Sequence, residues 1–129
     1  VHNEVVNNIT KIVFLVFIIF VIGIIIYSII NAESFGDVYI EQLRIADADK
    51  TLNNFSNEIT IEIGKSICIE ANNWINEETS LLSIQKILLQ NGVDVKKENR
   101  IIPIIRFHSI YELCPEKINV LEEIFVNNE

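Results

Sequence analysis

The chain has 129 residues, half of them apolar, and a formal net charge of −8. The acidity lies after residue 32, where nine basic residues are outnumbered by seventeen acidic ones, while the segment before it is neutral. A surface of that sign repels phosphate backbones, so we expect no nucleic acid partner. The abundance of Ile, Leu, Val and Phe, with few Pro and Gly, also excludes a disordered chain.

The first predicted element is an apolar run of nineteen residues, from Ile12 to Ile30. It carries no charge, and every residue except Gly23, Tyr27 and Ser28 is Ile, Leu, Val or Phe. As a helix it would span about 28 Å, close to the hydrocarbon thickness of a bilayer. Its insertion would be favoured by about 5–10 kcal/mol. We therefore predict that residues 12–30 contact the lipid bilayer as a single transmembrane helix.

Two alternatives to an anchor remain open at this point: a buried core helix, and a signal peptide cleaved after Ala32. The apolar run exceeds the 7–15 residues typical of a signal peptide core, which favours an uncleaved anchor. The predicted organisation is then a short flank over residues 1–11, a transmembrane helix over 12–32 and an acidic domain over 33–129.

Charges beside the helix predict its direction. Lys11 precedes the apolar run, and the next basic residue is Arg44, well beyond its other end. Because basic residues flank the cytoplasmic ends of membrane helices, we expect a cytoplasmic N-terminus. The acidic domain would then be extracytoplasmic, on a single-pass protein of the cell membrane.

A seven-residue repeat of apolar positions follows the membrane segment and predicts one long helix over residues 36–76. Its seam is a candidate surface for homo-oligomer formation. A strand over residues 59–63, where apolar and polar residues alternate, is the alternative for part of this range. The candidate seam residues are Val38, Ile45, Ala48, Leu52, Phe55 and Ile59.

The rest of the chain predicts three short elements. Ser80 is expected to cap an antiparallel helix that stops at Asn91 and Gly92. Residues 93–95 and 100–107 flank a polar link and predict a β-hairpin, with Pro103 at an edge or bulge. Pro115 suits the first turn of a C-terminal helix. The predicted fold class is therefore α-rich, of the α+β type.

Four stretches of the sequence carry a resemblance: RIADADKTL at residues 44–52, IGKS at 63–66, EANNWI at 70–75 and LLQNG at 88–92. With the N-terminal apolar helix, they resemble uncharacterised archaeal single-pass surface membrane proteins, which are pilin-like in layout. The resemblance implies an externally facing domain and a surface or pilus-like assembly, and it transfers no catalytic residues. Asn7, Asn8 and Lys11 depart from the apolar start of a pilin.

The chain has two cysteines, Cys68 and Cys114, too far apart in sequence for a CxxC motif. In an exported domain, a disulfide is the expected arrangement. Two buried thiols, a zinc site with His108 and a Cys114–His108 nucleophile pair are the alternatives. We expect no metal and no cofactor.

Two further residue types have simple interpretations. Trp74 lies on the apolar stripe and is expected in the core, and Asp47 and Asp49 are expected to diverge into solvent.

The sequence thus predicts a membrane-anchored structural or interaction protein, not an enzyme, with a protein partner or a homo-oligomer. The alternative is a ligand-binding or sensor ectodomain with a groove beside Trp74. Self-association through the seam would favour the first function, and a monomer with an apolar pocket would favour the second.

Overall fold

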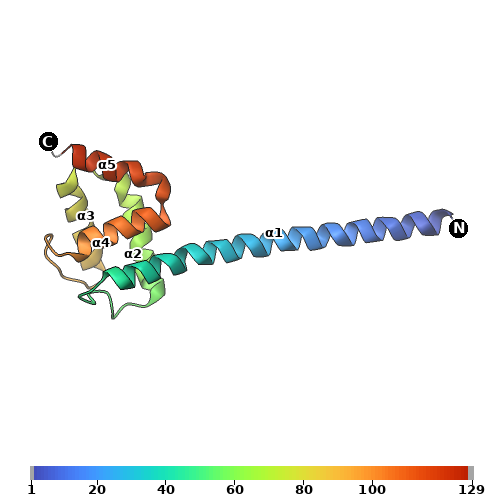
Figure 1. Cartoon of the computed structure of the whole chain (residues 1–129), viewed down its shortest axis with the longest axis horizontal. Coiled ribbons are helices and arrows are strands. Elements are labelled where there is room, and N and C mark those ends of the chain that lie inside the picture. The colour runs from blue at the N-terminus through green and yellow to red at the C-terminus, as the bar shows by residue number, and fades with distance from the viewer. Residues whose placement is uncertain (1, 128–129) are drawn as a thin grey trace. The chain divides into compact units, whose positions relative to one another are not determined.

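The computed structural model describes residues 2–127, and side chains within residues 3–29 and 36–127. Every regular element in that range is a helix (Figure 1). The chain divides into two compact units, Val1–Ser34 and Phe35–Glu129, and helix α1 (His2–Ala46) contributes to both. The side chain of Ala32, at the alternative cleavage site, lies outside the described residues.

In the first unit, α1 is apolar and exposed. Its segment Asn3–Ile29 has 27 residues and contains an 18-residue window with a mean hydropathy of 3.2, none of which is buried. Such a helix is about 40 Å long, so it is long and apolar enough to span a membrane. Its exposure contradicts the alternative of a buried core helix. Ser28 donates a hydrogen bond to the Ile24 carbonyl oxygen (3.0 Å), which satisfies its hydroxyl within the helix.

Helix α1 ends at Ala46, so the single helix predicted over residues 36–76 is wrong. Two side chains hold the loop that follows it. The Asp47 carboxylate accepts hydrogen bonds from the backbone N–H groups of Thr51 (3.0 Å) and Leu52 (2.9 Å). The Arg44 guanidinium donates to the carbonyl oxygens of Leu52 (2.6 Å) and Phe55 (2.8 Å). Asp47 is buried, contrary to the prediction that it is solvated.

Helix α2 (Asn57–Glu70) begins where Ser56 accepts a hydrogen bond from the N–H of Ile59 (3.2 Å), as expected of an N-cap. Residues 59–63 are therefore helical, and the strand alternative is wrong. Thr60, Ile63 and Ile67 lie buried at helical spacing, which explains why the helix outweighs the local β-propensity. A short 3₁₀ turn, η1 (Ala71–Asn73), continues it.

Helix α3 (Glu77–Gln90) starts earlier than predicted, because Asn76 and Thr79 cap it reciprocally. Ser80, the predicted cap, is instead buried inside the helix. The predicted stop is confirmed. Gly92 has a φ of 87°, and its N–H donates to the Leu89 carbonyl oxygen (3.0 Å) as the chain turns away from the helix.

The predicted β-hairpin is wrong, because the described residues contain no strand and residues 101–108 form helix α4 (Ile101–His108). Its buried side chains, Ile101, Ile102, Ile105 and Arg106, follow a helical repeat and not an alternating one. Pro103 is the third residue of the helix, where an N–H would have no intrahelical acceptor. Proline is therefore tolerated there.

Helix α4 continues as a π-helical turn, η2 (Ser109–Leu113), which ends at Cys114. Pro115 disfavours helical geometry at the residue before it, and Cys114 has φ −143° and ψ 60°. Pro115 opens η3 (Pro115–Lys117), followed by α5 (Ile118–Val126). The predicted C-terminal helix after Pro115 is thus confirmed.

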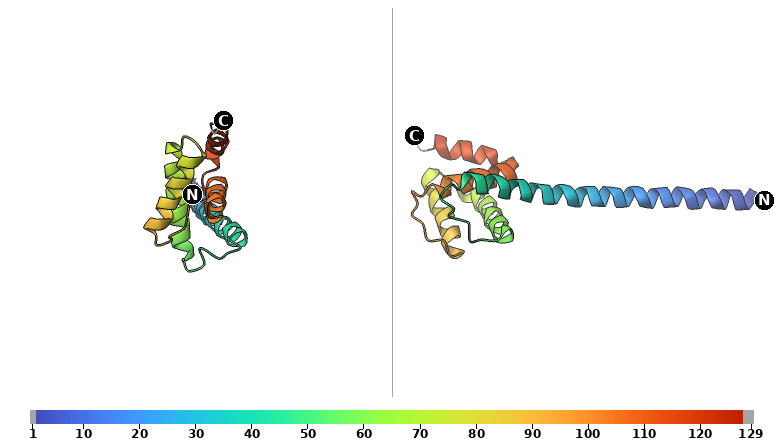
Figure 2. Two further views of the ribbon diagram at one scale, coloured as in Figure 1. Left: turned by 90° about the vertical axis from the view of Figure 1, so that its left-hand side faces the viewer. Right: turned by 60° about the horizontal axis from the view of Figure 1, so that its bottom comes forward.

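Within the second unit, α2 and α3 lie side by side, and α4 packs against α3 (Figures 1 and 2). Tyr39 of α1 is fully buried, with its hydroxyl 3.2 Å from the Ser109 hydroxyl. Burial raises the pKa of Tyr39 to about 12. Gly64 makes this approach possible, because a Cβ there would lie 2.6 Å from the Tyr39 hydroxyl oxygen and from Leu113 Cδ1.

Candidate functional site

The two cysteines form a disulfide in the core of the second unit. Cys68 comes from α2 and Cys114 from the break before η3, with their Cα atoms 6.2 Å apart and a sequence separation of 46. Both are buried. The carbonyl oxygen of Ser109 lies 3.5 Å and 3.6 Å from the two sulfur atoms, and Lys117 Nζ donates to the Cys68 carbonyl oxygen (2.5 Å). The bridge therefore joins α2 to the start of the C-terminal helical segment.

This pairing bears on the alternatives for cysteine chemistry. With both sulfur atoms in the bridge, neither is a free thiol for a nucleophile pair or a thiolate ligand. His108 is half-buried, stands edge-on to Phe107 and has a buried Nδ1 with no hydrogen-bond partner in the described structure. Burial lowers the pKa of His108, and the nearby carboxylate of Glu112 opposes that shift.

The six candidate seam residues do not share one helix. Val38 and Ile45 are on α1, Ala48, Leu52 and Phe55 are in the following loop, and Ile59 is on α2. Leu52 is buried in the core and Phe55 packs against it. The others are exposed, so no continuous seam forms in the described structure. A role of the exposed seam residues in self-association stays a prediction.

Trp74 lies in the core with 8% of its surface exposed, so its predicted place is confirmed. Its indole Nε1 is buried without a hydrogen-bond partner among the described residues. A cleft between α2 and α3, on the same unit, is lined by other residues. A groove beside Trp74 therefore stays a prediction.

An exposed stripe of large apolar side chains runs along α4 into η2. Phe107 and Tyr111 stack with ring centroids 5.4 Å apart and an angle of 11° between the rings, and each is about half exposed. Pro103, one helical turn earlier, is also exposed. These three residues, called the exposed stripe below, present aromatic surface of the kind enriched at protein interfaces.

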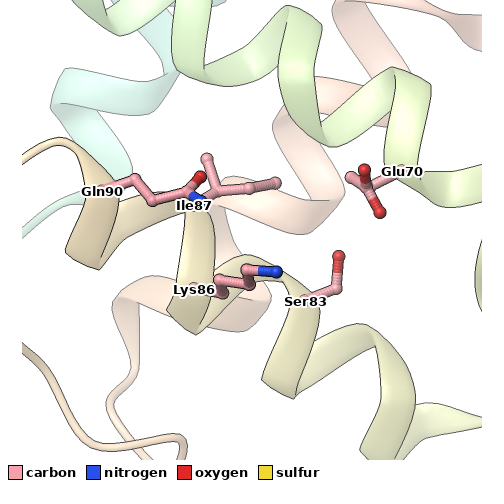
Figure 3. Close-up of a pocket in the computed structure, with 5 residues that line it drawn as sticks. All are labelled: Glu70, Ser83, Lys86, Ile87 and Gln90. Atoms are coloured by element: carbon pink, nitrogen blue, oxygen red, sulfur yellow. The ribbon is translucent and has the colours of Figure 1, made fainter.

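A small cleft opens between α2 and α3. Figure 3 shows Glu70 of α2 across from Ser83 and Lys86 of α3, and Ile87 and Gln90 complete the lining. Its volume is about 150 Å³. The Ser83 hydroxyl is buried with no hydrogen-bond partner among the described residues. The cleft thus gathers a carboxylate, an ammonium, a hydroxyl and an amide at one place.

The sequence prediction missed both surfaces, each for a different reason. The repeat of Pro103, Phe107 and Tyr111 becomes visible only when residues 101–113 are assigned as helix, and they were assigned in part to a strand. Ser83, Lys86 and Gln90 do share one face of a correctly predicted helix. Glu70, however, reaches the cleft from another helix, and no local pattern connects it to them.

No known family model, curated protein or solved structure matches the chain.

Proposed function

We propose that this chain is a non-enzymatic, membrane-anchored protein whose second unit lies outside the cytoplasm and binds another protein or a second copy of itself. The observation that carries the proposal is the exposed stripe of Pro103, Phe107 and Tyr111 on a disulfide-closed helical domain. The resemblance of the sequence to archaeal surface membrane proteins that are pilin-like in layout supports a role in a surface or pilus-like assembly.

Two features support the extracytoplasmic side. A buried disulfide persists in oxidising compartments and is rare in the cytosol. Lys11 precedes the membrane segment, and Arg44 is the first basic residue after it, which favours a cytoplasmic N-terminus. With one crossing and a cytoplasmic N-terminus, the domain would lie outside the cell membrane.

The interaction itself is supported by the character of the stripe. Aromatic side chains contribute much of the binding energy at interfaces, and the rigid rings lose little conformational entropy on binding. Phe107 and Tyr111 already hold each other in a stacked arrangement, which reduces that loss further. A surface of this kind fits a partner with an apolar patch of its own.

Topology is tested by adding protease to intact cells that carry a cytoplasmic tag at the N-terminus. We expect the second unit to be digested while the tag stays protected. Full protection of the second unit would place it in the cytoplasm and contradict the proposal.

Binding is tested by crosslinking in the native membrane and by sedimentation of the full chain in detergent micelles. The double variant Phe107→Ser, Tyr111→Ser should lose the crosslinked species and any concentration-dependent association. Leu89→Ser, which alters an equally exposed apolar residue on α3, is the matched control and should retain both. A wild-type chain that is monomeric and yields no crosslinked partner would overturn the interaction.

A further inference from the structure

The cleft between α2 and α3 has lining charges of opposite sign that come from different helices. Glu70 closes α2, and Lys86 lies in the second half of α3 (Figure 3). Within the described residues the two form no ion pair with each other, and Lys86 has no hydrogen-bond partner either. Glu70 accepts only a long hydrogen bond from the Asn73 side chain (3.5 Å). Both charges are therefore available to a molecule in the cleft.

The Ser83 hydroxyl can also form a hydrogen bond to a molecule in the cleft. Its hydroxyl oxygen is shielded from solvent yet has no partner in the described structure. A buried polar group without a partner is costly, so a molecule that hydrogen-bonds this hydroxyl would be stabilised in the cleft. Figure 3 shows this hydroxyl directed toward the Glu70 side of the cleft.

From this arrangement we propose that the cleft binds a small zwitterion of the α-amino acid class. The ligand carboxylate would accept hydrogen bonds from Lys86 Nζ and the Ser83 hydroxyl, and the ligand ammonium would pair with Glu70. Gln90 supplies an amide that can meet either group, and Ile87 supplies an apolar wall for a short side chain.

Size and charge narrow the ligand class. The volume of about 150 Å³ is below the range of about 300–1,000 Å³ typical of drug-sized ligand sites, so only a small molecule fits. A simple anion would face the Glu70 carboxylate in an acidic domain. A simple cation would face the Lys86 ammonium. A zwitterion can form an ion pair with each of the two side chains, Glu70 and Lys86.

This site goes beyond the proposed interaction function. The cleft is formed by α2 and α3, whereas the exposed stripe belongs to α4 and η2. Its failure would leave the partner-binding proposal intact, and loss of partner binding would leave the cleft intact.

The test is calorimetric titration of the full chain in detergent micelles with L-alanine as the probe. L-lactate lacks the ammonium and L-alaninamide lacks the carboxylate, and each should bind at least about tenfold more weakly. In ¹⁵N-labelled protein, L-alanine should shift the amide resonances of residues 83–90 and of Glu70.

Single substitutions test whether the Glu70 and Lys86 side chains bind the ligand. Glu70→Gln and Lys86→Gln should each weaken L-alanine binding about tenfold or more while the helical circular dichroism spectrum is unchanged. Glu62→Gln and Lys65→Gln alter an exposed ion pair on α2 that does not line the cleft, and serve as matched controls. No binding of L-alanine up to about 10 mM, equal binding of L-lactate, or equal loss in the control variants would each overturn the proposal.

Discussion

The apolar segment of α1 and the second unit are both rich in isoleucine, but its side chains lie in opposite environments. Along residues 12–29 the isoleucines are exposed, as a helix that spans a bilayer requires. In the second unit Ile63, Ile67 and Ile84 are fully buried against one another's helices. The first arrangement needs only a sufficient number of apolar residues. The second needs particular partners at particular positions.

This difference separates what composition decides from what packing decides. Transfer of a helix into lipid is close to a sum over residues, so one change in the membrane helix acts locally. A protein core is as closely packed as an organic crystal, so one substitution in the core of the second unit alters the packing of several helices. The predictions below test that contrast, from the largest expected effect to the smallest.

The largest effect is expected from two arginines at the centre of the membrane helix, in the double variant Phe17→Arg, Phe20→Arg. Each should cost about 2.5–3.5 kcal/mol, which together offsets most of the estimated insertion energy. The protein should leave the membrane fraction on carbonate extraction. Ile69→Arg with Leu89→Arg, at exposed positions of the second unit, is the control and should remain in the membrane. Retention of the first variant would contradict membrane anchoring.

The second prediction concerns the disulfide and confines the effect to the second unit. Opening a loop whose ends have a sequence separation of 46 should lower the free energy of unfolding by about 4 kcal/mol in the chain-entropy description. Guanidinium denaturation of the full chain, with and without reductant, measures the change. The double variant Cys68→Ala, Cys114→Ala should match the reduced protein. Carbonate extraction should be unaffected, since the membrane helix does not depend on the bridge.

Two glycines, one in each unit, provide a sharper comparison. Gly64→Ala should destabilise the second unit by about 1–3 kcal/mol, because the new Cβ would overlap Tyr39 and Leu113. At Gly23 a Cβ would meet nothing within 4 Å, so Gly23→Ala should leave the unfolding of the second unit unchanged. Chemical denaturation followed by tyrosine and tryptophan fluorescence reports both. Equal effects of the two variants would show that close packing around Gly64 is unimportant.

The same contrast explains how much the sequence could predict. The long apolar helix near the N-terminus followed from composition alone. The stop at Gly92 and the helix after Pro115 followed from residues that fix local backbone geometry. The disulfide followed from counting cysteines in a domain expected to be exported. Each of these depends on few residues, and those residues are neighbours or a unique pair.

The errors arose where distant contacts decide the local structure. Helix α1 ends at Ala46 because the side chains of Asp47 and Arg44 form hydrogen bonds with backbone groups of the loop. A heptad pattern of apolar residues does not detect such hydrogen bonds. Residues 100–107 were assigned to a strand because they follow a polar link after residues 93–95, and Pro103 was placed at an edge or bulge of that strand. Its actual place is the first turn of a helix whose buried face is set by α2 and α3. The cleft required Glu70 to meet α3, which only the folded chain specifies.

The smallest predicted effect tests the loop that broke the long helix. Asp47→Ala removes a buried carboxylate that accepts two backbone hydrogen bonds, and should cost about 1–2 kcal/mol. Asp49 is two residues away, but its carboxylate is largely exposed and pairs with Arg100 at 2.7 Å. Asp49→Ala should therefore cost only about 0.5 kcal/mol or less.

Guanidinium denaturation of the two variants, at equal protein and detergent concentrations, measures the difference. If both lose the same stability, the end of α1 depends on the charge of this segment and not on the bonds of Asp47. If Asp47→Ala instead stabilises the protein, the two hydrogen bonds of Asp47 do not hold the loop.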